Sequence, residues 1–205
     1  MRNPIFLLLA AAFCASPAIA GDNAELARIY EADQTARQHE TIDWEQVSKD
    51  DSARRDQVRS ILAAGGLRTS IDYFHAAMVF QHGDRLSDYR LAHALASIAS
   101  ELDPGNRPAA WLVAATFDRM LMNRLAAQWY GTQFYSDAQG LFLYPVEEAA
   151  ATDEERRTMN VPSLAESRER AAEMAAESGI PLRNPAPTIE QLRAERAASL
   201  RSPTP

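Results

Sequence analysis

The stretch from Tyr73 to Gln133 most constrains the fold, because apolar residues at helical spacing alternate there with turn residues. Gly83 and the Asp103-Pro104-Gly105 sequence break helices, so each helix is short and the next one follows after a few residues. Helices joined by such short turns pack side by side and run antiparallel. The sequence therefore predicts an all-α fold, a compact antiparallel array of helical hairpins. The expected helices cover residues 70–82, 87–102, 108–120 and 125–130.

A short aromatic loop or hairpin is expected after this array, near residues 131–145. Phe134-Tyr135 and Leu141-Phe142-Leu143-Tyr144 have strand-like composition, and the sequence Ser136 to Gly140 between them is typical of a turn. Aromatic side chains are dense here and are expected mainly to fill the core, or else to form the wall of a pocket.

Two further helices are expected before the array. The first covers about 22–39, where apolar residues form a narrow stripe, and the second begins at Asp51 or Ser52 and ends near Gly65-Gly66. Ile42 and Trp44 lie between them and are expected to anchor the connection to the core.

The C-terminal third is expected to be less central. Residues 163–179 are predicted to form a charged, alanine-rich helix at the periphery, since little of its surface is large and apolar. Residues 180–205 are predicted to form a proline-containing linker, a short helix and a disordered tail. The last 25 residues or so are therefore predicted to be dispensable for the core.

Residues 1–20 are predicted to be a cleaved signal peptide. Arg2 provides a positive start, Ile5 to Phe13 is an apolar run too short to span a bilayer, and Ala18-Ile19-Ala20 offers small residues at cleavage spacing. The mature protein is thus expected to be exported, periplasmic or secreted, with residues 21–162 as its helical core domain. Cleavage would remove Cys14, the single cysteine of the chain, and with it any thiol or disulfide chemistry.

Charge and motifs exclude several classes of function. The formal charge is -7, and the chain has no basic cluster, which argues against nucleic acid or an anionic membrane surface as a partner. No glycine-rich phosphate loop and no nucleophile elbow is present, so no cofactor is expected and no reaction is specified. The expected partner is a protein or a small ligand, and the oligomeric state stays open.

Two resemblances bear on the fold. Counted from Tyr73, residues Ala92, Ala99 and Pro104 fall where tetratricopeptide repeats have Ala, Ala and Pro, which makes one partial repeat. The sequences HAAMVFQHG, WLVAATFDR and QWYGTQ, with Ile42-Asp43-Trp44 and Arg54-Arg55, are similar to a family of uncharacterised bacterial proteins with a domain of unknown function. This resemblance covers about residues 27–162. It implies a shared fold and draws attention to the polar residues between Tyr73 and Gln133, here called the polar block. It implies no reaction.

The polar residues of this block are the candidates for a functional site. Histidine and aspartate are the usual general acids and bases, so the catalytic candidates are His75, His82 and Asp118. Amide, hydroxyl, indole and guanidinium groups suit ligand recognition, which gives as ligand-binding candidates Gln81, Trp111, Arg119, Gln128, Thr132 and Gln133. For the histidines a buried, hydrogen-bonded or simply exposed position is the favoured interpretation, and for Asp118 a structural ion pair is favoured. For Gln128, Thr132 and Gln133 the alternative is that their amides tie the aromatic loop to the helices.

No metal site is expected, because none of the strong ligand spacings occurs. His75 and His82 are about 10 Å apart along a straight helix, too far for one ion. His82 with Asp84 and His93 is the one geometrically conceivable set, since the chain turns after Gly83.

Three functions remain open from the sequence. The leading hypothesis is an exported helical module that binds a protein or small ligand, because helical hairpins stack into concave surfaces. The alternative is an uncharacterised enzyme whose cleft is built from His75, Gln81, His82, Asp118 and Gln133, with hydrolysis as the reaction class considered. A third is a purely structural envelope protein. Convergence of those five side chains would favour the enzyme, and their dispersal the binding module.

Overall fold

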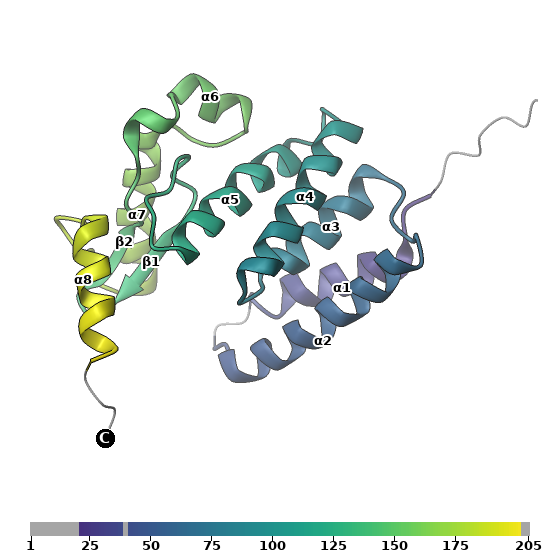
Figure 1. The fold of residues 1–205 in the computed structure, drawn as a ribbon, viewed down its shortest axis with the longest axis horizontal. Coiled ribbons are helices and arrows are strands. Elements are labelled where there is room, and N and C mark those ends of the chain that lie inside the picture. The colour runs from purple at the N-terminus through teal and green to yellow at the C-terminus, as the bar shows by residue number, and fades with distance from the viewer. Residues whose placement is uncertain (1–20, 39–40, 202–205) are drawn as a thin grey trace, which may run out of the picture.

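The structure, a computed structural model, describes residues 21–38 and 41–201 and is mostly helical. These residues form eight α-helices, one 3₁₀ turn and a single two-stranded hairpin (Figure 1). The expected signal peptide, residues 1–20, and the end of the expected C-terminal tail lie outside the described residues. Within the described ranges, no helix is both long and apolar enough to cross a bilayer.

The elements follow one another in simple order. The helices are α1 (Ala24–Thr35), α2 (Trp44–Ala63), α3 (Ser70–Gln81), α4 (Leu86–Leu102), α5 (Arg107–Asn123), α6 (Asp153–Thr158), α7 (Leu164–Ser178) and α8 (Ile189–Ser199), with the 3₁₀ turn η1 at Glu148–Ala150. The antiparallel hairpin consists of β1 (Phe134–Asp137) and β2 (Gly140–Leu143), in a register that pairs Phe134 with Leu143 and Asp137 with Gly140. The hairpin predicted near 131–145 is therefore confirmed.

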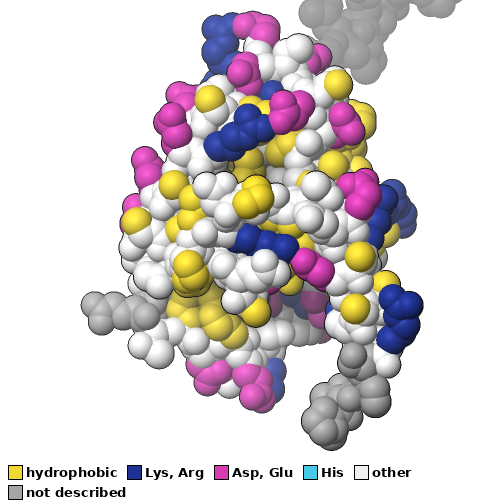
Figure 2. Space-filling view, turned by 90° about the vertical axis from the view of Figure 1, so that its left-hand side faces the viewer, with side chains coloured by type: hydrophobic (Ala, Val, Ile, Leu, Met, Phe, Trp, Pro, Cys, Tyr) yellow, Lys and Arg dark blue, Asp and Glu magenta, His cyan; other side chains and the backbone are white. Residues whose placement is uncertain are grey.

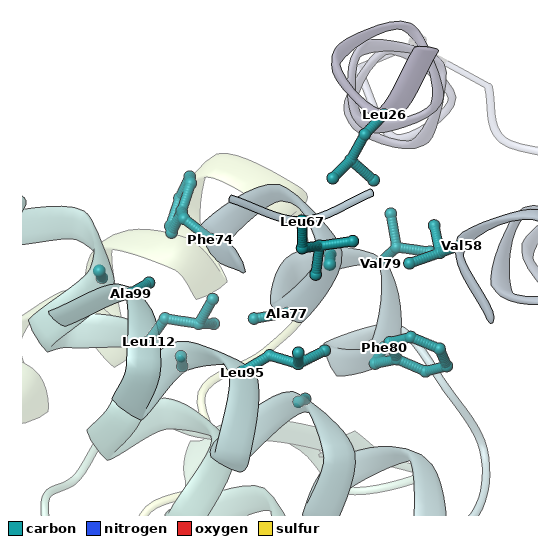
Figure 3. Packing of buried hydrophobic residues seen from close by; sticks show 14 of the residues in the cluster. Leu26, Val58, Leu67, Phe74, Ala77, Val79, Phe80, Leu95, Ala99 and Leu112 are labelled. Atoms are coloured by element: carbon teal, nitrogen blue, oxygen red, sulfur yellow. The ribbon is translucent and has the colours of Figure 1, made fainter. Parts of the chain in front are cut away.

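Helix α3 lies at the centre of the main hydrophobic core. It contacts α1, α2, α4 and α5, and its Ala76, Ala77, Val79 and Phe80 are fully buried (Figure 3). Alanines of α4 and α5 are fully buried as well, which lets the helix backbones approach closely. Helices α3, α4 and α5 lie side by side and are joined only by residues 82–85 and 103–106, as the turn residues predicted.

The start of α3 is fixed by a capping box. The Thr69 hydroxyl accepts a hydrogen bond from the Asp72 backbone N–H at 3.1 Å, and the Asp72 carboxylate accepts one from the Thr69 N–H at 3.2 Å. The same carboxylate also accepts from the backbone N–H of Asn23 at 2.7 Å. Because Asn23 is the N-cap of α1, one buried side chain holds the first turns of two helices together.

Helix α2 begins at Trp44, well before the predicted start at Asp51. Asp43 caps it by accepting hydrogen bonds from the N–H groups of Glu45 and Gln46. The first two turns are mostly exposed, with Val47 as their buried apolar residue, so they lack the apolar periodicity on which the prediction relied. Trp44 is 63% exposed, and the expectation that it anchors the connection to the core is wrong.

The short helix predicted over 125–130 does not form. Leu125, just after the end of α5, has a left-handed backbone conformation (φ 52°), and residues 126–130 contain no helical turn. The Gln128 N–H donates to the Pro145 carbonyl at 2.9 Å, and its carbonyl accepts from the Glu147 N–H at 2.8 Å. The backbone here therefore makes strand-like bonds with residues 145–147 that a helix could not make.

The hairpin is the centre of a second, smaller hydrophobic cluster. Helix α7 buries Leu164, Ala171 and Ala175 against Leu141 and Leu143 of β2, so small residues integrate this helix with the hairpin despite its charged outer face. Ser163 and Glu166 form a capping box at its start, and Gly179 ends it in the left-handed conformation.

The C-terminal segment packs on the other side of the hairpin. The Leu141 N–H donates to the Pro181 carbonyl at 2.8 Å, and the Arg183 N–H donates to the Leu141 carbonyl at 2.9 Å. Leu192 of α8 then packs against Phe142 and Tyr144. Among the described residues, the buried members of the main core end at Leu112, and none comes from the last 25 residues. The hairpin, by contrast, contacts that segment directly. The prediction that the segment is dispensable for the core stays a prediction.

Candidate functional site

Asp118, a predicted catalytic residue, anchors the loop that follows α5. Its carboxylate is fully buried and accepts four hydrogen bonds, from the N–H groups of Trp129 (2.8 Å), Tyr130 (3.0 Å) and Thr132 (3.1 Å) and from the Thr132 hydroxyl (2.8 Å). Burial raises the pKa of Asp118, and these hydrogen bonds offset part of that rise. Since every acceptor position of the carboxylate is used, Asp118 has a structural role.

The glutamines of the block form a second buried network. The Gln128 side chain donates to the Gln133 and Tyr144 carbonyls, at 3.0 and 2.8 Å, and accepts from the Gln133 N–H at 2.9 Å. The side-chain amides of Gln133 and Gln81 both reach the Ala115 carbonyl, at 3.2 and 3.5 Å. These bonds tie the loop to α3 and α5, so the amides of Gln128 and Gln133 are occupied within the protein.

His75 and Trp111 pack against the main core. The His75 imidazole stacks on Tyr30 at 4.1 Å between ring centroids, with the rings 16° from parallel. Trp111 is half-buried against the same core. Neither side chain contacts Asp118 or the glutamine network within the described residues. Of the five side chains of the enzyme hypothesis, Gln81, Asp118 and Gln133 are joined through the Ala115 carbonyl and the Thr132 hydroxyl, whereas His75 and His82 lie in separate environments.

His93 is held by α5, and the conceivable metal set is not assembled. Its Nδ1 lies 3.2 Å from the Val113 carbonyl and 3.1 Å from the Thr116 hydroxyl, whereas His82 and Asp84 lie at the end of α3 and beyond. In residues 21–38 and 41–201 no three histidine, cysteine, aspartate or glutamate side chains are grouped as metal ligands would be.

The stability of the protein should decrease on mild acidification. Burial lowers the pKa of both His75 and His93 below 6.5, against smaller opposing effects of acidic neighbours and of the Val113 carbonyl respectively. Below about pH 6.5 the unfolded chain then binds more protons than the folded one, so the free energy of unfolding should fall between about pH 7.5 and 5.5. Urea unfolding at each pH measures this. His75→Gln and His93→Gln should each flatten the profile, and an unchanged profile in both would contradict it.

His82 is held by a buried carboxylate that the sequence did not single out. Its Nδ1 lies 2.8 Å from Oδ2 of Asp33, which is fully buried in α1. The other oxygen of Asp33 pairs with Arg37 at 3.2 Å, and Arg37 also binds Asp51 of α2. This ion network connects α1, α2 and the end of α3, and His82 lies at the wall of a cavity beside it.

Arg119 is the predicted ligand-binding residue that does face open space. It follows Asp118 on α5 and lines two cavities, one beside His82 and a larger one of about 540 Å³ toward α8. We call the larger one the α5–α8 cavity. Its walls come from α4, the end of α5, the hairpin and α8, through residues that include Tyr89, Met122, Tyr135, Tyr144, Leu192 and Arg196. Figure 2 shows the side of the molecule on which α8 lies, where hydrophobic side chains gather between charged ones.

Two polar atoms of the α5–α8 cavity wall are buried without a protein partner. Nε of Arg119 and the hydroxyl of Tyr144 find no hydrogen-bond partner among the described residues, although Tyr144 is only 3% exposed. Leaving such a group unsatisfied costs about 1–3 kcal/mol, so this arrangement is uncommon in a folded protein. Burial raises the pKa of Tyr144 despite the lowering effect of nearby Arg193, which keeps its hydroxyl a neutral donor at physiological pH.

The charges around the α5–α8 cavity are unevenly neutralised. Its two acidic residues, Asp137 and Glu195, both bind Arg183, which crosses from the C-terminal segment to the hairpin. Arg119, by contrast, makes no ion pair with any residue in the described ranges; its guanidinium carbon lies 5.8 Å from the Tyr89 ring centroid. The free charge that the cavity offers a ligand is therefore positive.

The sequence did not single out most of these wall residues. Tyr144 belongs to an aromatic stretch with no further signal, and Leu192 and Arg196 lie in a helix predicted to be dispensable for the core. The prediction of a pocket wall in the aromatic stretch was the single available signal. Comparison with known proteins adds no further assignment: no family model, no curated protein and no solved structure matches the chain.

Proposed function

We propose that the protein is an exported helical binding protein that holds a small organic anion with an apolar or aromatic body in the α5–α8 cavity. Export rests on the signal-peptide pattern of residues 1–20. The observation that carries the binding function is that Arg119 Nε and the Tyr144 hydroxyl, both hydrogen-bond donors, are buried without protein partners in one cavity wall. Both atoms are covered by neighbouring protein atoms, so the proposal includes a small shift of the wall that opens them to the ligand. A ligand that accepts from both would then remove the cost of leaving them unsatisfied.

An anionic group on the ligand follows from the charge of this wall. The Arg119 guanidinium is always protonated, and its planar donors match a carboxylate, sulfonate or phosphate. Because Arg183 already binds Asp137 and Glu195, these carboxylates repel an anion less than free ones would. Hydrogen bonds to a charged acceptor are also stronger than neutral ones, which favours an acid over an alcohol.

The rest of the cavity suits an apolar or aromatic body. Tyr89 and Tyr135 provide ring surfaces, and Met122 and Leu192 provide aliphatic ones. A volume of about 540 Å³ lies within the range typical of small-molecule sites, roughly 300–1,000 Å³. The cavity is thus mostly apolar with a few polar groups, the usual composition of a specific ligand site.

Binding is favoured over catalysis by the positions of the candidate acids and bases. Asp118 uses its acceptor positions on the loop, and His75 is stacked on Tyr30, so neither is offered to a substrate in the α5–α8 cavity. We further propose that α3, α4 and α5 form a tetratricopeptide-like helical array, which is supported by their consecutive packing and buried alanines. In that arrangement the array is a rigid support for one wall of the cavity.

Two fluorescent probes test the proposal. The first is 8-anilinonaphthalene-1-sulfonate, an aromatic anion, and the second is N-phenyl-1-naphthylamine, the same ring system without the sulfonate. The first should bind in a 1:1 complex and at least about tenfold more tightly than the second, equivalent to about 1.4 kcal/mol. Arg119→Met should weaken sulfonate binding by about tenfold and remove the preference.

Arg124→Met is the matched control, because Arg124 is exposed at the end of the same helix and does not line the cavity. Its sulfonate affinity should stay within about twofold of wild type. Tyr144→Phe should weaken sulfonate binding while leaving the free energy of unfolding unchanged or raising it by about 1 kcal/mol, because it deletes an unsatisfied buried hydroxyl. Equal binding of both probes, or equal effects of Arg119→Met and Arg124→Met, would refute the proposal.

A further inference from the structure

A second cavity, of about 340 Å³, lies between α1, α2 and the turn after α3. We call it the α2–α3 cavity. Its wall differs from that of the α5–α8 cavity: it is lined mainly by charged and planar side chains, with one exposed tryptophan at its edge. Its lining includes Trp44, Asp51, Arg55, His82 and Asp84.

The charges of the α2–α3 cavity nearly cancel. Arg37 is paired with Asp33 and Asp51, and Arg55 lies 3.9 Å from Asp84. Arg119 also reaches this cavity, and the buried Asp33 lies behind His82. The wall itself has three guanidinium groups and two carboxylates, Asp51 and Asp84, and the fully buried Asp33 behind it offsets much of the remaining positive charge. A charged ligand would meet one attractive and one repulsive partner, so the wall favours a neutral ligand with many hydrogen-bonding groups.

The donors and acceptors of this wall are held in fixed positions. Asp33 binds Nδ1 of His82, which leaves Nε2 as the ring atom available to a ligand. Arg55 is 9% exposed and is oriented by contacts to the His82 carbonyl at 3.4 Å and to Asp88 at 3.7 Å. Planar guanidinium and carboxylate groups can each make two parallel hydrogen bonds, a geometry that fits neighbouring hydroxyls on a ring. Pre-organised polar groups of this kind bind hydroxyls at a low entropic cost.

Trp44 provides the apolar complement. It is the first residue of α2, and 63% of its surface is exposed, more than for the other large hydrophobic side chains of the described core helices. An indole ring left in water at the edge of a polar cavity offers a flat surface on which a ring with C–H groups can stack. A flat ring face beside fixed polar groups matches a molecule that is apolar on its faces and hydroxylated around its rim.

We propose that the α2–α3 cavity binds a neutral sugar ring, stacked on Trp44 and hydrogen-bonded by Arg55, His82 and Asp84. This inference goes beyond the binding of an organic anion in the α5–α8 cavity and does not depend on it. Arg119 lines both cavities, but their other wall residues differ, and so does the ligand chemistry that they favour. No covalent step is involved.

Labelling with 5-fluorotryptophan tests the proposal, because Trp44, Trp111 and Trp129 give separate ¹⁹F resonances that single Trp→Phe variants assign. The probes are glucose, galactose, mannose and N-acetylglucosamine, each added to the mature protein up to about 50 mM, well above a millimolar Kd. At least one of them should shift the Trp44 resonance saturably and leave that of Trp129 in place. Glucuronate and glucosamine, which carry a charge, should bind more weakly than the best neutral sugar.

Asp84→Asn and Trp129→Phe are the matched pair of variants. The Asp84 side chain is 69% exposed, so the change should not affect folding, yet it should weaken sugar binding by about fivefold or more, because it replaces one of the two carboxylate acceptors with a donor and removes the charge. Trp129 is 40% exposed outside the cavity, and its replacement should leave the affinity unchanged. A Trp44 resonance that none of the four sugars moves, or tighter binding of a charged sugar, would overturn the proposal. Neither result would bear on sulfonate binding at Arg119.

Discussion

Asp118→Ala should lower the free energy of unfolding by about 3–5 kcal/mol, the largest effect we expect of any single side-chain truncation in the block. The change removes the acceptor of three backbone N–H groups and one hydroxyl, all contributed by residues 129–132. These donors lie in a segment that has neither helical nor hairpin bonds of its own to replace them. Urea unfolding followed by circular dichroism measures the loss.

Two further variants separate the hydrogen bonds from the change in volume. Asp118→Asn keeps the shape and one acceptor oxygen but sets its NH₂ group against the donors of Thr132, so it should fall between Asp118→Ala and wild type. Asp103→Ala removes an exposed carboxylate that accepts one N–H, from Gly105, and should cost less than about 1 kcal/mol. A cost of Asp118→Ala as small as that of Asp103→Ala would contradict the structural role of Asp118.

Gly140→Ala should undock the C-terminal segment from the hairpin. Gly140 has φ 137°, a conformation that L residues rarely adopt, and an added Cβ would lie 2.1 Å from the Pro181 carbonyl oxygen and 2.9 Å from the Arg183 nitrogen. Since backbone rather than a flexible side chain occupies that space, β2 and residues 181–183 cannot both keep their positions. Strain and overlap together should cost about 3 kcal/mol or more.

Hydrogen exchange at the Leu141 and Arg183 amides measures this undocking, because both N–H groups bond across the contact. Exchange at both should accelerate by about 100-fold or more, while amides in α3 should keep their protection. The control is Gly65→Ala: Gly65 also has positive φ (68°) but open space around it, so about 1 kcal/mol of strain is expected. Unchanged exchange in Gly140→Ala would show that residues 181–183 do not pack on β2 as described.

The same substitution connects the fold to the proposed ligand site. Leu192, Glu195 and Arg196 of α8 form one wall of the α5–α8 cavity, and α8 is held in place through the contact of residues 181–183 with β2. Gly140→Ala should therefore also weaken sulfonate binding, although Gly140 does not line the cavity. Gly65→Ala, far along the chain in the turn after α2, should leave that binding unchanged.

Local signals made the helical array predictable. The capping boxes at Thr69, Ser163 and Thr188 and the left-handed Gly179 mark helix ends through residues close in sequence, and the structure has each of them. Prediction was wrong where local signals were misleading or weak. The first turns of α2 are polar, so the sequence shows no apolar periodicity where this helix begins. Residues 125–130 have helix-like composition, but Gln128 bonds to residues 145–147, which are distant in sequence.

The candidate site was less predictable because distant segments build it. Arg119 was identified as a ligand residue by its place in the polar block, but nothing near it in sequence distinguishes it from Asp118, which is fully satisfied. What distinguishes Arg119 is the α8 wall, contributed by residues more than 70 positions away. Likewise, Asp33 could not be identified as the partner of His82, since the contact joins α1 to the end of α3.

A crystal structure of residues 21–205 with 8-anilinonaphthalene-1-sulfonate bound tests the central claim most directly. We expect one probe molecule in the α5–α8 cavity. Its sulfonate should lie within hydrogen-bond distance of Arg119 Nε and the Tyr144 hydroxyl, and its rings should pack against Tyr89 and Tyr135. A probe bound elsewhere, or a cavity in which these two donors bond to the protein's own groups and leave no room for the sulfonate, would contradict it.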